Sequence, residues 1–207
     1  VAPLSFFKDI VEFAKKHKVT VKYTSASSAF KTYFNRFVTA KLEKSCVETE
    51  KLEAESYYGG RVECFRLGEF KGDEKYYMLD INSLYPFVMS KNFFPTKEVG
   101  YKTDYFIADC TVKVEKPILP YRMNGKLCFP IGTFRGVWCS CELNNPDVVI
   151  KKIHKVVYYE AENIFCDYVN YFYPLKQNAK NDFEKLFSKL LLNSLYGKFG
   201  QKYIKTT

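Results

Sequence analysis

The chain has 207 residues, 47% of them hydrophobic and 27% charged, a composition that is typical of a folded globular protein and excludes a disordered one. Its net charge of +9 and its 18% aromatic content suit a nucleic-acid partner whose bases stack on rings, but a lysine-rich surface over a phenylalanine-rich core gives the same numbers. The apolar runs are too short to cross a membrane, and we expect no signal peptide.

The N-terminal quarter of the chain is predicted to be mainly helical. Residues 1–18 form a helix that Ser5 caps, and a short β-branched run follows at 19–23. A second helix is predicted over 29–38, whereas 41–56 is charged and mixed, so we expect a connecting segment there. The apolar stripe of the first helix is Phe6, Phe7, Ile10, Val11 and Ala14. The second helix has candidate caps at Ser25, Ser27 and Ser28 and an aromatic face of Phe30, Phe34 and Phe37.

The stretch Tyr57–Gly60 places two tyrosines before two glycines. Adjacent glycines permit a tight turn into a strand, which is the commoner meaning of such a pair, and they also let another backbone approach closely. We predict a strand at 62–65, a turn at Lys71-Gly72-Asp73 and a second strand at 76–80.

Asp80 is predicted to end the second of these strands. Ser83 is a good N-cap, Leu84 and Tyr85 open a helix, and Pro86 is tolerated in a first helical turn. A carboxylate beside the free amides of a helix start suits a metal ion on one side and phosphate oxygens on the other. A single aspartate in this position is more often a cap or turn residue.

Residues 99–143 are predicted to form a β-rich insert. Apolar alternation begins in YFIADCTVKV, turn signals follow at Lys116-Pro117, Asn124-Gly125 and Gly132, and Trp138 lies in the last strand.

A helix, a strand and another helix are predicted after this insert. Residues 144–146 suit the start of a helix that carries Val148, Val149 and Ile153, and 156–159 form a strand. Residues 162–175 then form a helix whose aromatic stripe is better explained as core than as a base-stacking platform. That stripe is Ile164, Phe165, Tyr168, Val169 and Phe172.

The last helix has the clearest pattern. Asn181 can cap it in a capping box with Glu184, and Gly197 or Gly200 can end it. Its buried stripe is predicted to be Phe183, Leu186, Phe187, Leu190, Leu191 and Leu195. One face carries Lys185, Lys189, Asn193 and Tyr196. A lysine row is commonly a solvated face, but here asparagine and tyrosine continue it toward the glycines.

These pieces suit phosphoryl transfer, in which metal ions and basic groups neutralise the phosphates. Asp80 supplies one carboxylate, and Lys189 with Lys185 supplies a clamp for a triphosphate. No second carboxylate has comparable context; Asp109 follows an apolar run without a turn to expose it, and we interpret it as structural.

Three stretches resemble conserved elements of family B DNA polymerases, in the order that the family has them. DINSLYP resembles motif A, KLLLNSLYGKFG resembles motif B, and YYGG is similar to the YxGG element upstream. The long segment between the two motifs resembles the first insertion of the protein-primed branch, which occurs in phages, adenovirus-like viruses and linear plasmids. The resemblance extends from about residue 20 to the end.

The resemblance implies a role for each matching residue. Asp80 would be the catalytic metal ligand, with help from the Ile81 carbonyl, and Tyr85 would stack on the sugar and exclude ribonucleotides. The other nucleotide-binding residues would be Leu84, Lys185, Lys189, Asn193 and Tyr196. The DNA-binding residues would be Tyr57, Gly59, Gly60, Ser83 and Gly197, with the first three on the template strand. The implied partners are template and primer DNA, a deoxynucleoside triphosphate (dNTP) and a terminal priming protein, with no membrane.

The fold that the resemblance implies is α+β: part of a polymerase palm of antiparallel strands and helices, a β-rich insertion and a helical fingers segment. We expect a helical segment leading into the palm at 1–56, palm with YxGG and motif A at 57–90, the insertion at 91–175, and the fingers helix with motif B at 176–207.

Motif C, an aromatic-x-Asp-Thr-Asp string that carries the second catalytic carboxylates of this family, does not occur in the chain. We therefore expect an excerpt of a polymerase that does not polymerise alone, with Mg²⁺ or Mn²⁺ bound only together with those carboxylates. The alternative is a non-catalytic DNA-binding remnant. A nuclease or transposase is disfavoured because paired acidic motifs are lacking.

The seven cysteines are scattered, without a CxxC pair and without a histidine at ligand spacing. This pattern disfavours zinc and indicates reduced thiols in a cytosol-like compartment. We expect the cytosol of a bacterium or host cell, and a virion or organelle-plasmid context is compatible with it.

Overall fold

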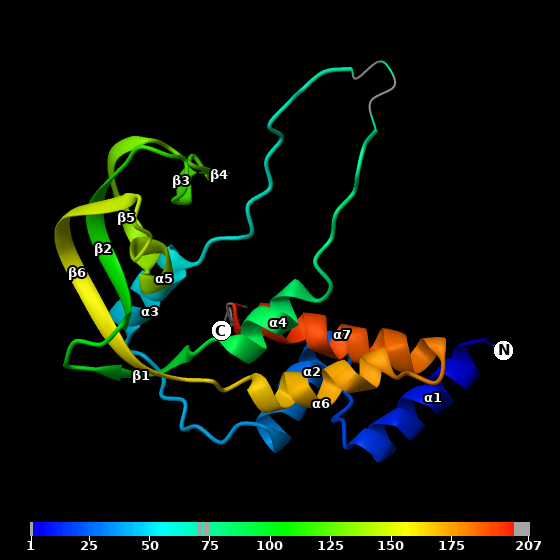
Figure 1. Cartoon of the computed structure of the whole chain (residues 1–207). Helices are drawn as coiled ribbons and strands as arrows, with labels where there is room; N and C mark the ends of the chain where they lie inside the picture. The colour runs from blue at the N-terminus through cyan, green and yellow to red at the C-terminus, as the bar shows by residue number, and fades with distance from the viewer. Residues whose placement is uncertain (1, 70–71, 73–74, 201–207) are drawn as a thin grey trace. The chain divides into compact units, whose positions relative to one another are not determined.

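The computed structural model describes residues 2–69, 72 and 75–200, which group into two compact units (Figure 1). The helical unit takes its described residues from Val1–Lys41, Ile81–Phe94 and Glu162–Thr207. The sheet unit takes its described residues from Leu42–Asp80 and Pro95–Ala161. Each unit has a hydrophobic core of its own. No helix among the described residues is both long and apolar enough to span a membrane.

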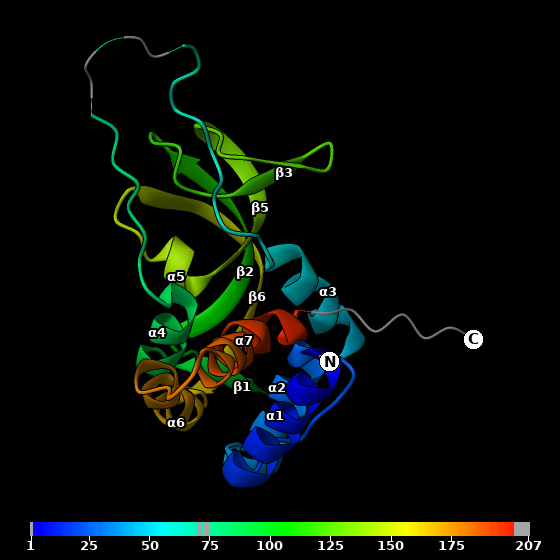
Figure 2. The same ribbon diagram turned by 90° about the vertical axis from the view of Figure 1, so that its right-hand side faces the viewer.

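The helical unit contains α1 (Ala2–His17), α2 (Ser25–Arg36), α4 (Leu84–Lys91), α6 (Cys166–Gln177) and α7 (Asp182–Phe199). The last two helices, α6 and α7, lie side by side, and α2 packs on α7 as well (Figures 1 and 2). The predicted helices in these regions are therefore confirmed.

Aromatic side chains fill the core of the helical unit. Tyr168 and Phe172 are fully buried, which confirms that the stripe of α6 is core. The Tyr168 hydroxyl donates to the Leu191 carbonyl at 3.0 Å, and the Tyr33 hydroxyl donates to the Ile164 carbonyl at 3.1 Å. Since each buried hydroxyl has an acceptor, these rings contribute apolar burial without leaving a polar atom unpaired.

The sheet unit is built from antiparallel strands. Its four-stranded sheet has the order β1-β6-β2-β5, and β3 and β4 form a separate hairpin. The elements are α3 (Val47–Ser56), β1 (Phe94–Val99), β2 (Tyr105–Val114), β3 (Tyr121–Met123), β4 (Lys126–Cys128), β5 (Gly132–Cys139), α5 (Ser140–Leu143) and β6 (Val148–Glu162). The β-rich insert is thus confirmed.

Side chains on the two faces of this sheet alternate along β2. Cys110 and Val112 are buried on one face in a cluster with Trp138, whose indole N–H donates to the Pro120 carbonyl at 2.8 Å. Ile107 points to the other face, where it packs in a cluster with Leu52 of α3. The predicted turn at Asn124-Gly125 is confirmed, because both residues have positive φ (53° and 76°) and join β3 to β4.

The predicted helix after Pro146 is wrong. Val148 instead begins β6, which pairs with β2 from Val148 to Tyr159 and includes the correctly predicted strand at 156–159. The amide of Asp147 donates to the Asn145 side chain at 2.9 Å, so the Asn-Asn-Pro signal makes a turn rather than a helix start. The β-branched residues that follow it favour a strand.

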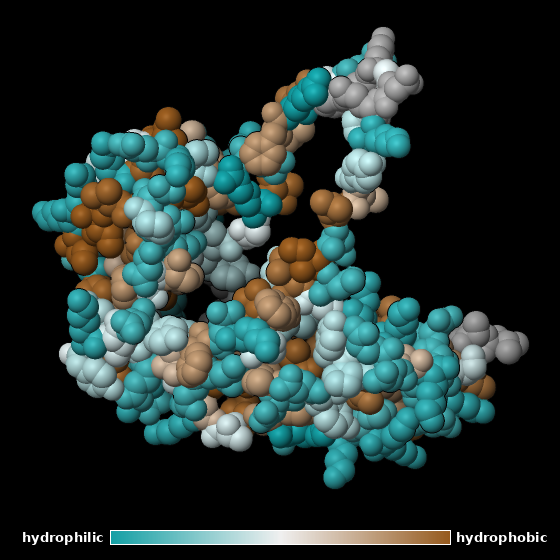
Figure 3. All heavy atoms as spheres, in the orientation of Figure 1, coloured by the Kyte–Doolittle hydropathy of each residue, from teal (hydrophilic) through white to brown (hydrophobic). Residues whose placement is uncertain are grey.

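The predicted strands at 62–65 and 76–80 are also wrong. Between residues 57 and 80 the described part of the chain contains no strand, and its apolar side chains point into solvent (Figure 3). The most exposed are Val62 (95%), Phe65 (84%), Met78 (97%) and Leu79 (91%). A β-branched or aromatic run needs a partner strand to form a ladder, and none pairs with it here. Lys71 and Asp73 of the predicted turn lie outside the described residues.

The β-branched run at 19–23 makes no strand because side chains of α2 occupy its amides. The Thr20 amide donates to the Thr32 hydroxyl and the Lys22 amide to the Ser28 hydroxyl, both at 2.9 Å. The segment expected to be a connection at 41–56 contains α3.

Two predicted caps and two predicted stripes need correction. Ser5 lies inside α1, and Thr24 rather than a serine caps α2, accepting from the Ser27 amide at 3.1 Å. In α1, Phe13 is buried while Phe6 and Phe7 are exposed. In α7, Leu192 is buried while Leu186 and Leu190 are 48% and 37% exposed. In both helices the packing partners, and not the apolar pattern alone, decide which side of a broad stripe is covered.

Candidate functional site

The exposed face of α7 carries four of the predicted site residues. Lys185, Lys189, Asn193 and Tyr196 are all exposed, and the helix buries the opposite side through Leu191 and its neighbours. The Asn181 side chain accepts from the Glu184 amide at 2.8 Å, which confirms the N-cap. The Glu184 carboxylate accepts from the Lys180 amide at 2.9 Å, one residue before the predicted partner. The cap therefore fixes where the polar row begins.

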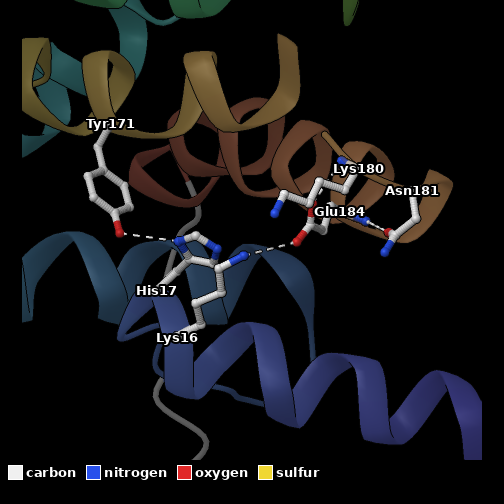
Figure 4. Close-up of polar contacts among 6 residues, drawn as sticks. All are labelled: Lys16, His17, Tyr171, Lys180, Asn181 and Glu184. Atoms are coloured by element: carbon white, nitrogen blue, oxygen red, sulfur yellow. Dashed lines mark hydrogen bonds and ion pairs between the residues drawn. The ribbon is translucent and has the colours of Figure 1, made fainter. Parts of the chain in front are cut away.

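Contacts with α1 also hold the N-terminal end of α7 (Figure 4). Lys16 of α1 forms an ion pair of 3.3 Å with Glu184, and the neighbouring His17 lies 3.3 Å from the Tyr171 hydroxyl of α6. Burial, together with the nearby Lys16 charge, lowers the pKa of His17. The neutral imidazole is thus favoured, and it can share a hydrogen bond with Tyr171 in either direction.

Tyr85 and Tyr196 bring the start of α4 to the C-terminal half of α7. Their rings are stacked with centroids 4.4 Å apart and an interplanar angle of 8°. About half of Tyr85 and 39% of Tyr196 remain exposed, so both rings retain accessible area. At Gly197, the residue after Tyr196, an added Cβ would meet no atom within 4 Å, so the space at this glycine is open.

Ser83 precedes α4 but does not cap it through its side chain. Its backbone is left-handed, with φ of 55°, and its hydroxyl accepts from the Lys176 ammonium at 2.6 Å. A non-glycine residue in this conformation is held there by its surroundings. Sequence reasoning missed Lys176, because a single lysine in the last turn of a helix carries no signal of what it will contact.

The chain passes from the sheet unit to the helical unit between Asp80 and Ile81. Both are exposed. The described residues contain no group of three or more histidine, cysteine, aspartate or glutamate side chains placed to hold a metal ion. Asp109, interpreted as structural, pairs with Arg135 through two hydrogen bonds on the neighbouring strand.

The Tyr57–Gly60 stretch belongs to the sheet unit. Tyr57 is half exposed, and burial raises the pKa of Tyr58 to about 12. An added Cβ at Gly59 would meet nothing within 4 Å, so the backbone is accessible there. Direct contacts within the helical unit thus pair Ser83 with Lys176 and Tyr85 with Tyr196, whereas Tyr57–Gly60 belongs to the sheet unit.

Comparison with known families decides what this arrangement belongs to. Residues 4–207 match the family described as DNA polymerase type B, organellar and viral. The chain belongs to this family. Divalent-metal dependence is a general property of such polymerases.

Relatives of this type B chain include a probable DNA polymerase of Podospora anserina, 31% identical over 205 residues that make up 91% of this chain and 16% of the relative. The DNA polymerase of Acidianus bottle-shaped virus is 28% identical over 92% of this chain and 33% of its own. That of Streptococcus phage Cp-1 is 28% identical over 60% of this chain and 27% of its own. The chain therefore spans a third or less of these relatives.

The fold is similar to that of Phi29 DNA polymerase complexed with primer-template DNA, with a TM-score of 0.65, 18% identity and coverage of 93% of this chain and 38% of that chain. The α+β class predicted from the sequence, as part of a family B polymerase fold, is thus confirmed.

Proposed function

We propose that this chain is the part of a DNA-directed DNA polymerase that binds the incoming dNTP and the template strand. The observation that carries the proposal is the Tyr85–Tyr196 stack, because it joins the helix of motif A to the face of α7 that carries Lys185 and Lys189. Family membership over residues 4–207 supports the same reaction class.

The triphosphate would bind along the lysine row of α7. Lys185 and Lys189 are both exposed and one helical turn apart, so their ammonium groups can contact successive phosphates. Lys176 adds a third positive charge beside Ser83. A clamp of this kind neutralises the charge that phosphoryl transfer concentrates on the phosphate oxygens.

The sugar and base would lie against the aromatic pair. Tyr85, with Leu84 beside it, would contact the sugar and leave no room for a 2′-hydroxyl, which selects deoxyribonucleotides. Asn193 and Tyr196 would line the new base pair, and the open space beside Gly197 would admit either pairing.

A divalent ion would be held by the Asp80 carboxylate and the Ile81 carbonyl. Both are hard oxygen donors of the kind that Mg²⁺ or Mn²⁺ prefers, so the residues fit the ion. One carboxylate leaves most of a two-ion site to residues outside the described set. When bound, such ions neutralise the triphosphate and align its oxygens; the chain's own part is to present Asp80 at the entry to the motif A helix.

The template strand would contact Tyr57, Gly59 and Gly60, and Ser83 and Gly197 would contact DNA near the new base pair. Phi29 polymerase, whose fold is similar, has been seen with primer-template DNA and incoming nucleotide. The insertion at 91–175 would contact duplex DNA and a terminal priming protein. Along the chain it would follow the palm part at 57–90 and precede the fingers helix at 176–207. The protein would work in a bacterial or host cytosol.

Titration of the full chain with dNTP and Mn²⁺, followed by tyrosine fluorescence, tests the proposal. Replacing Lys185 and Lys189 together by alanine should weaken dNTP binding about 100-fold, since each charged contact accounts for roughly tenfold. The matched control is alanine at Lys151 and Lys152, which removes two exposed charges from β6. Equal losses in both pairs would contradict the proposal. DNA binding without any dNTP binding would favour the non-catalytic remnant.

A further inference from the structure

The stretch Tyr57–Gly60 has no strand or helix to hold its shape. Its residues belong to no regular element, and the nearest one, α3, ends at Ser56. A glycine pair in such a segment has many accessible conformations and loses much entropy when it is fixed. A surface that depends on the path of this backbone therefore needs contacts from elsewhere.

Arg122 of β3 provides the first of these contacts. Its guanidinium donates to the Tyr57 carbonyl and lies over the Tyr58 ring, 4.9 Å from the ring centroid. One side chain thus holds both the backbone and the side chain of the residues before the glycines. The planar guanidinium suits this double role, because it stacks and donates at the same time.

Arg61 provides a second contact immediately after the glycines. Its guanidinium donates to the Pro117 carbonyl at 2.7 Å and lies 4.3 Å from the centroid of the Phe129 ring. Pro117 and Phe129 both flank the β3–β4 hairpin. The glycine pair therefore lies between two segments that arginine contacts hold, one before it and one after it. Each contact joins the Tyr57–Arg61 stretch to the insertion.

We propose that Arg122 is a positioning residue: it holds the Tyr57–Gly60 backbone in the path that receives the template strand, so that the insertion shapes the template site. This inference rests on the template role proposed above for Tyr57, Gly59 and Gly60. Arg122 acts through the Tyr57 carbonyl and makes no phosphate contact of its own.

The test is binding of the full chain to a labelled primer-template oligonucleotide with a single-stranded 5′ overhang, measured by fluorescence anisotropy at several salt concentrations. Arg122→Ala should weaken binding about tenfold, the usual effect of losing one charged hydrogen bond. The slope of log affinity against log salt should stay unchanged, because no phosphate contact is lost. Arg122→Lys should bind as weakly as Arg122→Ala, since lysine keeps the charge without the planar group.

The matched control is Lys8→Ala, which removes an exposed charge from α1, a helix that carries none of the proposed DNA-binding residues. Equal effects of Arg122→Ala and Lys8→Ala would overturn the inference, and so would a salt slope that falls by about one, which marks a direct phosphate contact. Gly59→Val tests the underlying template role, since the added side chain projects into open space. If Gly59→Val binds DNA like the unaltered chain, the template role itself fails. If Gly59→Val weakens binding and Arg122→Ala does not, only the inference fails.

Discussion

Single tyrosines differ sharply in what they contribute to this molecule. Tyr168 is fully buried and hydrogen bonded, whereas Tyr85 is half exposed and stacks on Tyr196. A sequence pattern cannot separate these cases, because both residues lie on helices beside apolar neighbours. The difference lies in the tertiary contacts: Tyr168 packs against Tyr33 of α2 and donates a hydrogen bond to α7, whereas Tyr85 stacks on one ring of α7.

Tyr168→Ala should therefore lower the free energy of unfolding by about 3–5 kcal/mol, the usual cost of emptying a large aromatic core position. Tyr85→Ala should lower it by only about 1 kcal/mol, the value of one aromatic pair. Urea denaturation of the three proteins checks this difference. Equal losses would contradict this assignment, because the half-exposed stack would then contribute as much as the buried core position.

Asp109 gives the sheet unit a dependence on pH. Its hydrogen bonds from Arg135 lower the pKa of the carboxyl below the ordinary value of 3.8. The folded state then binds fewer protons than the unfolded state at low pH, so the contribution is present above the unfolded pKa and is lost as pH falls through the folded one.

Asp109→Asn should remove this contribution. The Asp109→Asn variant should be less stable than the unaltered chain at pH 6. This difference in stability should shrink as the pH falls below about 3.8. Thermal melts from pH 6 to pH 3 measure it. Arg135→Ala is the partner control and should flatten the same part of the curve; a difference that grows toward pH 3 would contradict the assignment.

At the scale of elements, packing in β5 explains why residue 136 is a glycine. A Cβ at this position would lie 2.6 Å from the Trp138 ring, which is buried on the same face two residues later. Glycine is therefore needed for space rather than for a special backbone angle. Gly136→Ala should cost about 1–3 kcal/mol of unfolding free energy through overpacking. Gly100→Ala, where the Cβ meets nothing within 4 Å, is the matched control and should be neutral in chemical denaturation.

The N-cap of α7 makes a contribution to stability that can be measured. Asn181→Ala should lower stability by about 1 kcal/mol, because the Glu184 amide loses its acceptor. Asn181→Ser or Asn181→Asp should restore most of the loss, since either side chain can accept the same bond. If neither replacement restores stability in chemical denaturation, the hydrogen bond to the Glu184 amide is not what Asn181 contributes.

Elements with local signals were the ones that the sequence could predict. The cap and glycine end of α7 and the Asn-Gly hairpin turn depend on neighbours in the chain, and the structure has them. The strand at Val148 and the absence of one at 76–80 depend on partner strands far away in sequence. The roles of Lys176 and Arg122 could not be predicted from the sequence either, because the groups that they contact are also far away in sequence.

At the scale of the whole molecule, the helical unit is assembled from three separate segments of the chain, joined through one core. Phe13 and Tyr33 from the first segment, and Met89 from the second, are buried among residues of α6 and α7. The described backbone between Tyr57 and Asp80 forms no helix or strand and carries exposed side chains. Cutting that stretch breaks no core contact within the helical unit.

Brief trypsin treatment should therefore cleave first between Tyr57 and Asp80, at Arg61, Arg66 or Lys75, because proteases need an extended, accessible backbone. The two fragments should stay together on gel filtration, since Phe13 and Tyr33 hold α1 and α2 against α6 and α7, and Leu52 holds α3 against the sheet. The helical circular-dichroism signal should change little. Tyr33→Ala weakens the helical contact, so the fragments of the cleaved variant should separate at a lower urea concentration than those of the cleaved, unaltered chain. Separation of the cleaved, unaltered chain would mean that the core joining the three segments is weaker than its burial implies.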